Sequence, residues 1–212
     1  MNNIIISIDG GAGSGKQRIA KYIANKYNFY HLDSGNLYRR IASIIIKKKI
    51  NVNNIHEIKK LINNIDYISD RSHKLLRKEK ISKLSSKIAI IPTIRRFINS
   101  QQKKIAKKKL LKFKGCVVDG RDIGSKVFKR AKIKLFIHVK AKIRAKRRHK
   151  QLIAIGEKSI YAQILKEINL RDKTDKTRKS SPLMVPKGAI NIDNSDSFKR
   201  TIKQINEALK KI

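Results

Sequence analysis

The chain contains little of several residue types, and each shortage excludes a class of protein. There is one cysteine, Cys116, among 212 residues, so no internal disulfide framework can hold the fold. No apolar run approaches the roughly 20 residues that a membrane-spanning helix needs. The N-terminus also has no basic segment followed by a long apolar run, so we expect no signal peptide. These absences predict a cytoplasmic protein that does not associate with a membrane.

Acidic residues are the most marked shortage. Asp and Glu number 15 against 53 Lys and Arg, which gives a formal net charge of +38. This excess allows weak, non-specific binding of RNA through phosphate neutralisation. Compositional drift is the favoured interpretation, because Ile and Asn are also abundant and the lysines are spread over every expected element. The charge alone does not decide between these interpretations.

Apolar patterning predicts an α/β fold. A helical pattern over 19–27 separates the first two of five short apolar runs, as in a layered, largely parallel sheet. The runs lie at 4–8, 29–32, 116–118, 133–139 and 189–192. The spacing of apolar residues over 197–212 predicts a closing helix.

Two segments depart from this alternation. Residues 40–85 are rich in lysine and asparagine and have weak periodicity, which indicates an insert between the first part of a core, 1–39, and its remainder, 86–212. Residues 147–182 are dense in charge and are punctuated by Gly156 and Pro182, as expected for a mobile flap.

The segment "GGAGSGK" predicts a phosphate-binding loop. Gly10, Gly15 and Lys16 satisfy the G-x-x-x-x-G-K spacing, after a strand and before a helix. Glycines let backbone N–H groups surround phosphate oxygens, and the lysine reaches the β- and γ-phosphates of a nucleotide. The candidate ATP-binding residues are Gly10, Gly11, Ala12, Gly13, Ser14, Gly15, Lys16, Gln17 and Arg18.

The loop departs from the usual pattern after its lysine. A Ser or Thr there normally helps to hold Mg²⁺, but this chain has Gln17 followed by Arg18. The backbone cradle does not depend on that hydroxyl, and the Arg18 guanidinium could instead donate to a phosphate. The loop therefore still predicts binding of a nucleoside triphosphate, with no metal ligand from the protein assigned.

Four further stretches combine arginines with carboxylates or hydroxyls. They are "HLDSGNLYRR", "SSKIAIIPTIR", "VVDGRDIGSKVF" and "RDKTDKTR". In the last stretch Arg171, Asp175 and Arg178 share one face of an expected helix. Each stretch taken alone is more typical of surface ion pairs, but together they match what a phosphorylated acceptor with a polar base requires.

With these motifs the sequence resembles the bacterial cytidylate kinases, which are P-loop nucleoside monophosphate kinases, over nearly its whole length. The resemblance implies a parallel five-stranded sheet flanked by helices, a short insert for the nucleoside monophosphate and an arginine-rich lid at about 147–182. It implies transfer of the γ-phosphoryl group of ATP to CMP or dCMP, with Mg²⁺ as cofactor. We expect the protein to be a monomer. The insert is compressed over 67–84, where long-form relatives have a small β-sheet.

The resemblance also implies roles for particular positions. Lys16, Arg147, Arg148 and Arg171 would be catalytic. The CMP-binding residues would be Ser34, Arg39, Ser86, Arg95, Asp122, Arg171, Asp175 and Arg178. Among them Asp122 and Asp175 would contact the cytosine, and the arginines would hold the acceptor phosphate.

Two alternatives remain open from the sequence. One is a small P-loop kinase with a different acceptor, against which the many arginines argue. The other is a catalytically decayed nucleotide- or RNA-binding protein, which the altered loop and the charge favour and the retained acceptor residues oppose.

Overall fold

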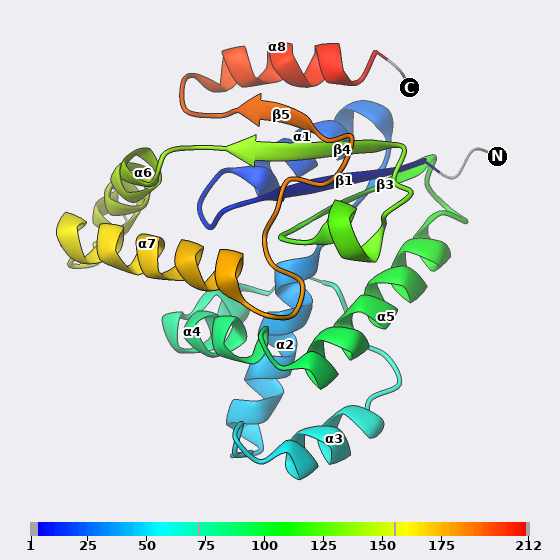
Figure 1. Ribbon diagram of the computed structural model, residues 1–212, viewed down its shortest axis with the longest axis vertical. Coiled ribbons are helices and arrows are strands. Elements are labelled where there is room, and N and C mark those ends of the chain that lie inside the picture. Colours follow the sequence, from blue (N-terminus) through cyan, green and yellow to red (C-terminus); the bar gives the residue numbers. More distant parts are fainter. Residues whose placement is uncertain (1–3, 72, 155, 211–212) are drawn as a thin grey trace.

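The fold is built on a five-stranded sheet in which every pairing is parallel (Figure 1). The computed structural model describes residues 4–71, 73–154 and 156–210. The strands are β1 (Ile4–Gly10), β2 (Tyr30–Asp33), β3 (Gly115–Gly120), β4 (Ile133–His138) and β5 (Ile190–Asp193), in the spatial order β2-β3-β1-β4-β5. All five predicted strands are confirmed, within a few residues at each end.

Helices cover both faces of this sheet (Figure 1). They are α1 (Lys16–Tyr27), α2 (Ser34–Lys47), α3 (Ile55–Asn63), α4 (Glu79–Ile88), α5 (Pro92–Lys109), α6 (Ala141–Ala154), α7 (Tyr161–Thr177) and α8 (Phe198–Ala208), with a short 3₁₀ helix at Lys74–Arg77 and a π-helical turn at Ile123–Val127. The closing helix is confirmed as α8, and positions 211–212 of its predicted range lie outside the described residues.

The alternation of side chains along β3 explains the two cores. Cys116 and Val118 pack on one face, in a cluster with residues of α2, α3 and α5, whereas Val117 faces a second cluster with α1 and α8. Successive strand residues point to opposite faces, so a continuous apolar run such as "CVV" has to be covered on both sides.

The predicted insert is helical. Helix α2 crosses residue 40 and α4 crosses residue 85, with α3 between them at the foot of Figure 1. No strand occurs among the described residues of 67–84, in keeping with the compressed sequence there. The proposed boundaries of the insert stay a prediction, as does the mobility of the 147–182 flap, which folds largely as α6 and α7. Position 72 of the insert and position 155 of the flap lie outside the described residues.

None of the helices within the described ranges is both long and apolar enough to span a membrane.

Candidate active site

The loop between β1 and α1 has the conformation that its glycines permit. Gly13 and Gly15 have φ angles of 71° and 86°, in the left-handed region that residues with a Cβ rarely adopt. A Cβ at Gly10 would lie 2.5 Å from the carbonyl oxygen of Ile137 in β4, so the loop also packs too closely on the sheet for a side chain there. The predicted loop is therefore formed at the carboxyl end of the central strand.

The loop is held by a residue that the sequence motif did not reveal. Asn194, which follows β5, donates from Nδ2 to the Ser14 carbonyl over 2.8 Å, and its Oδ1 accepts from Thr201 of α8. A Cβ at Gly15 would collide with this amide. Since Asn194 lies 180 residues from Ser14, no local sequence pattern could have identified it.

Lys16 lies inside the loop rather than in solvent. Its side chain is buried, and Nζ donates to the Gly11 carbonyl over 2.7 Å and to Ser14 Oγ over 3.2 Å. Burial, with the positive charge of Arg121 adding to it, lowers the pKa of Lys16 well below its usual value. Both acceptors of this ammonium are neutral oxygens, and a bound polyphosphate would supply the negative charge to balance it.

Two carboxylates lie at the carboxyl ends of the adjacent strands β2 and β3. Asp33, the last residue of β2, pairs in register with Asp119, the next-to-last residue of β3, and burial together with the charge of Asp119 raises the pKa of Asp33. The Asp119 carboxylate lies 2.7 Å from Nε2 of His31. No cluster of three or more acidic, histidine or cysteine side chains that could hold a metal occurs in the described part of the chain.

These two carboxylates nevertheless suit Mg²⁺. The ion prefers oxygen ligands, keeps several waters, and is commonly bound by one or two carboxylates with substrate phosphates. Asp33 and Asp119 would hold it, directly or through water, and it would neutralise charge on the nucleotide phosphates.

The two unusual residues after the lysine point in different directions. Gln17 donates from Nε2 to Asp33 Oδ2 over 3.0 Å. The guanidinium of Arg18 is exposed and lies over the ring of Phe198 in α8, 3.7 Å from its centroid. The structure thus gives Arg18 a partner other than phosphate, and its predicted phosphate contact stays a prediction.

Most of the predicted acceptor residues meet in one buried network beyond β3. Arg95 of α5 donates to Asp122 over 2.6 Å, and Arg178 lies 4.0 Å from the other oxygen of Asp122. Arg178 and Arg121 also pair with Asp175, at 3.3 and 3.1 Å. Three stretches far apart in the sequence are therefore brought together.

Several polar atoms in this region have no hydrogen-bond partner in the protein. Among the described residues, Tyr38 Oη, Arg171 Nε and Arg178 Nη2 are buried without a hydrogen bond. Burial lowers the pKa of Arg171 to about 10 and raises that of Tyr38 to about 12. Buried donors without partners are rare in folded proteins, and a phosphorylated ligand would satisfy them.

Three predicted acceptor residues take other contacts. Ser34 is buried at the start of α2, and Arg39, one turn further on, donates to Asn36 over 3.2 Å. Ser86 donates to the Ser82 carbonyl within α4, and the adjacent Ser85 is the more buried of the two. Their roles toward CMP stay predictions.

Asp9 fixes the turn that carries Asp122. Its two carboxylate oxygens each accept a backbone N–H at 2.8 Å, from Ile123 and Gly124. Burial raises the pKa of this carboxyl to about 6. A charged residue within an apolar strand was the signal that could have singled it out.

Helix α6 contacts the loop through a residue that no sequence motif marked. Arg144 of α6 donates to the Ala12 carbonyl over 2.9 Å and also pairs with Asp172 of α7. The two predicted catalytic residues of this region differ from it: Arg147 donates to the carbonyls of Asn194, Ser195 and Asp196, and Arg148 is exposed. Neither contacts the loop, so their catalytic role stays a prediction.

Comparison with known proteins agrees with this geometry. The family model described as "Cytidylate kinase" matches residues 6–212. The chain belongs to the cytidylate kinase family. It is 36% identical over 222 aligned positions to the cytidylate kinase of Fusobacterium nucleatum, covering all of both chains. It is 39% identical to that of Clostridium botulinum strain Langeland, covering 92% of each chain.

Solved structures show the same fold at lower identity. TT1252 from Thermus thermophilus superposes with a TM-score of 0.57 at 16% identity, covering 100% of this chain and 99% of that one. An uncharacterised protein from Eubacterium ventriosum gives 0.52 at 19%, covering 98% of each chain. At these identities the likeness concerns the fold alone, an α/β sheet flanked by helices.

Proposed function

We propose that this member of the cytidylate kinase family transfers the γ-phosphoryl group of ATP to CMP or dCMP, giving ADP and CDP or dCDP. The observation that carries the proposal is the pairing of two sites at the carboxyl edge of one sheet. A glycine loop enclosing Lys16 lies on one side, and the Arg95–Asp122–Arg178–Asp175 network with its unpaired buried donors lies on the other.

Each site supplies what one nucleotide requires. The loop N–H groups and Lys16 surround the donor's β- and γ-phosphates. Asp33 and Asp119 would hold Mg²⁺, which would supply positive charge to offset that of the phosphates. Buried arginines without enough partners bind the acceptor phosphate, and the Asp122 and Asp175 carboxylates accept from the exocyclic amine of cytosine. Catalysis then comes from holding two polyanions in line and compensating their charge.

The lid has a defined connection to this chemistry. Because Arg144 binds both the loop and Asp172 of α7, movement of α6 and α7 is coupled to the loop that holds ATP. Closure would bring Arg171 and Arg178, at the end of α7, toward the acceptor phosphate while it excludes water. We place this reaction in a cytoplasmic monomer.

The direct test is a coupled assay of ADP formation with ATP and each of CMP, dCMP, UMP and AMP. We expect the highest kcat/KM with CMP or dCMP. Equal turnover of all four nucleotides would contradict a cytosine-reading acceptor site. Binding of ATP without turnover of any of them would support the decayed-protein alternative instead.

A further inference from the structure

A second ligand-sized groove lies at the other end of the sheet from the active site. It has a volume of about 450 Å³, and Ile5, near the start of β1, is one of the residues that line it. The phosphate loop follows the other end of that strand. At about 3.3 Å per strand residue, the two sites are roughly 20 Å apart. A ligand in the groove would therefore not reach the nucleotides at the loop.

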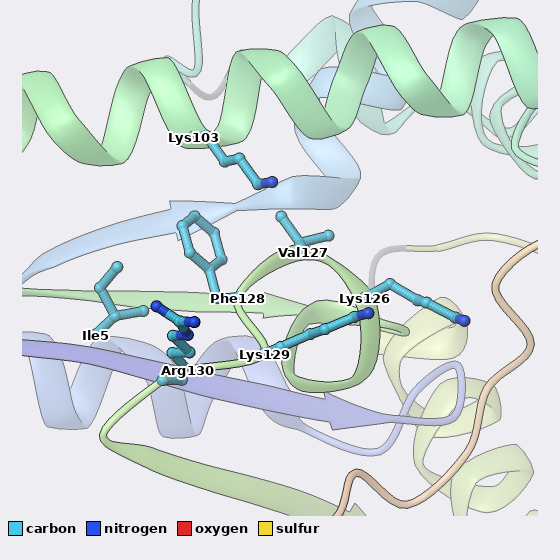
Figure 2. Close-up of a pocket in the computed structure, with 8 residues that line it drawn as sticks. Ile5, Lys103, Lys126, Val127, Phe128, Lys129 and Arg130 are labelled. Carbon is cyan, nitrogen blue, oxygen red and sulfur yellow. The ribbon is translucent and has the colours of Figure 1, made fainter.

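The groove combines an apolar floor with cationic walls. Figure 2 shows the ring of Phe128 between Lys103, which reaches down from α5, and Arg130. Lys126 and Lys129 complete its cationic lining, and it has no acidic lining residue within the described chain. None of the four cations forms an ion pair with any other described residue.

The catalytic reaction does not account for this arrangement. Three of the four cations lie within five consecutive residues, between the Asp122 turn and β4, and the fourth comes from a helix more than 20 positions earlier. The fold therefore places Lys103 and Arg130 on either side of the Phe128 ring, while Lys126 and Lys129 extend from the adjoining turn away from the ring, with no acidic partner in the described chain (Figure 2). Like charges gathered in this way repel one another, and a bound polyanion would relieve that repulsion.

We propose that this groove binds single-stranded nucleic acid, with a base stacked against Phe128 and the flanking phosphates on the four cations. Stacking platforms between cationic side chains are the usual way in which proteins bind single strands without reading their sequence. A duplex does not fit this description, since its bases are stacked on one another and their faces are not free to pack on an aromatic ring.

The adjoining surface has the same character. A second groove, of about 420 Å³, begins at Ile4 and is lined by Tyr27, Lys26 and Lys114, again with no acidic lining residue among those described. The amino edge of the sheet thus carries aromatic and cationic side chains on both sides of the start of β1.

The experiment measures binding of a fluorescein-labelled oligouridylate of about 12 nucleotides by anisotropy, from about 50 to 500 mM salt. We compare Lys126→Gln/Lys129→Gln/Arg130→Gln with a control of equal net charge, Lys59→Gln/Lys60→Gln/Lys203→Gln, whose lysines are exposed on α3 and α8. The groove variant should lower the slope of log affinity against log salt by about 2, since a single strand releases about 0.7 counterion per charge contact. The control should leave the slope unchanged; an equal effect of both variants would mean diffuse attraction and overturn the proposal.

Two further arms test the stacking and the location. Phe128→Leu should weaken the oligouridylate about fivefold or more without altering the salt slope, while the same oligomer in a duplex with oligoadenylate is unaffected by the substitution. Unchanged single-strand affinity in a folded Phe128→Leu protein would overturn the proposal. Two other results would also overturn the proposal. One is a rise in the KM for CMP when the oligomer is added, and the other is displacement of the oligomer by UMP at the same phosphate concentration. Either result would mean that the strand occupies a mononucleotide site.

Discussion

Gln17 donates a hydrogen bond to Asp33 across 3.0 Å, from the residue after the loop lysine to the carboxylate that ends β2. The position that usually offers a hydroxyl to Mg²⁺ here donates to one of the two carboxylates that would hold the ion. The departure in the loop therefore has a structural consequence: a possible metal ligand is replaced by a residue that orients the Asp33 carboxylate.

Gln17→Ala should weaken Mg²⁺ binding about tenfold, since loss of an orienting hydrogen bond commonly costs that much metal affinity. The pKa of Asp33 is already raised by burial and by Asp119, and without the amide donor it should rise further. Mg²⁺ titrations of the ADP complex, followed by the unfolding temperature, measure this without relying on turnover. Gln17→Ser serves as the matched variant and should recover Mg²⁺ affinity; if Gln17→Ala binds Mg²⁺ as the wild type does, the hydrogen bond has no such role.

Lys16→Met should reduce phosphoryl transfer about 100-fold or more, because charge stabilisation of this kind contributes about 3–4 kcal/mol. The methionine retains most of the buried stem and removes the charge. Lys21→Met, at an exposed position of the same helix, is the control and should leave kcat unchanged. A folded Lys16→Met enzyme with more than a tenth of wild-type turnover would show that the loop assignment is wrong.

The same substitution should stabilise the ligand-free protein at neutral pH. The pKa of Lys16 is lower in the folded state than in the unfolded chain, where it is near 10.5. The folded state thus releases this proton first, and the free energy of unfolding that Lys16 contributes rises as pH increases between the two pKa values. The advantage of Lys16→Met in denaturant titrations should shrink toward pH 10, and a constant difference from pH 7 to 10 would contradict the lowered pKa.

Asp122→Asn and Asp175→Asn should reduce the preference for CMP over UMP about tenfold or more. A carboxylate accepts from the cytosine amine and repels the uracil carbonyl, while an amide can serve either base. The measurement is kcat/KM for both acceptors, with the KM for ATP as the internal control. An equal loss for CMP and UMP would indicate that these aspartates only hold the arginines in place.

The Arg95–Asp122 ion pair should also matter for stability, because both side chains are almost completely buried. Arg95→Leu leaves the carboxylate with Arg178 at 4.0 Å as its nearest cation, and the free energy of unfolding should fall by about 3 kcal/mol. Arg95→Leu/Asp122→Leu should recover much of this loss. Lys83→Ala, which breaks the exposed pair with Glu79, is the control and should have no measurable effect; no recovery in the double variant would mean that packing, not charge, dominates.

The sequence predicted the fold and the loop well for physical reasons that act locally. Apolar runs such as that of β1 must be covered on both faces, and the glycines before Lys16 leave few other conformations for the chain. The motifs likewise pointed to Arg95, Asp122, Asp175 and Arg178, which the structure brings into contact. Their meeting depends on the order of parallel strands, because the ends of such strands lie at one edge.

Asn194 and Arg144, which no motif identified, contact residues that lie far from them in the sequence. Asn194 reaches Ser14 and Arg144 reaches Ala12 only because β4 lies beside β1, with β5 next to β4 on that side of the sheet. A lone Asn or Arg in a chain with 53 basic residues carries no local signal. The direction of a long exposed side chain such as Arg18 is equally unpredictable, since its partner Phe198 comes from the far end of the sequence.

The substitution Arg18→Thr distinguishes two roles for this arginine, packing on Phe198 and contact with the ATP phosphates. The guanidinium lies 3.7 Å from the Phe198 ring centroid, a cation–π contact worth about 0.5–1 kcal/mol at an exposed site. It therefore ties the start of α1 to α8, and its charge stays near the positive end of the helix, which is unfavourable without a bound anion. If this contact persists with ATP, Arg18→Thr and Phe198→Leu should lower the unfolding temperature by similar amounts, and neither should weaken ATP.

If instead the arginine leaves Phe198 for a phosphate, the two substitutions should separate. Arg18→Thr would then weaken ATP severalfold, because a charged fork of donors is lost, whereas Phe198→Leu would strengthen it by releasing the guanidinium. Calorimetric titration of ATP into both variants and into Arg18→Thr/Phe198→Leu measures the difference. From the geometry we expect Arg18 to stay on Phe198. The effects of the two substitutions on the unfolding temperature should then be non-additive, while ATP affinity is unchanged in all variants. Non-additive effects on ATP affinity would instead establish Arg18 as part of the phosphate site.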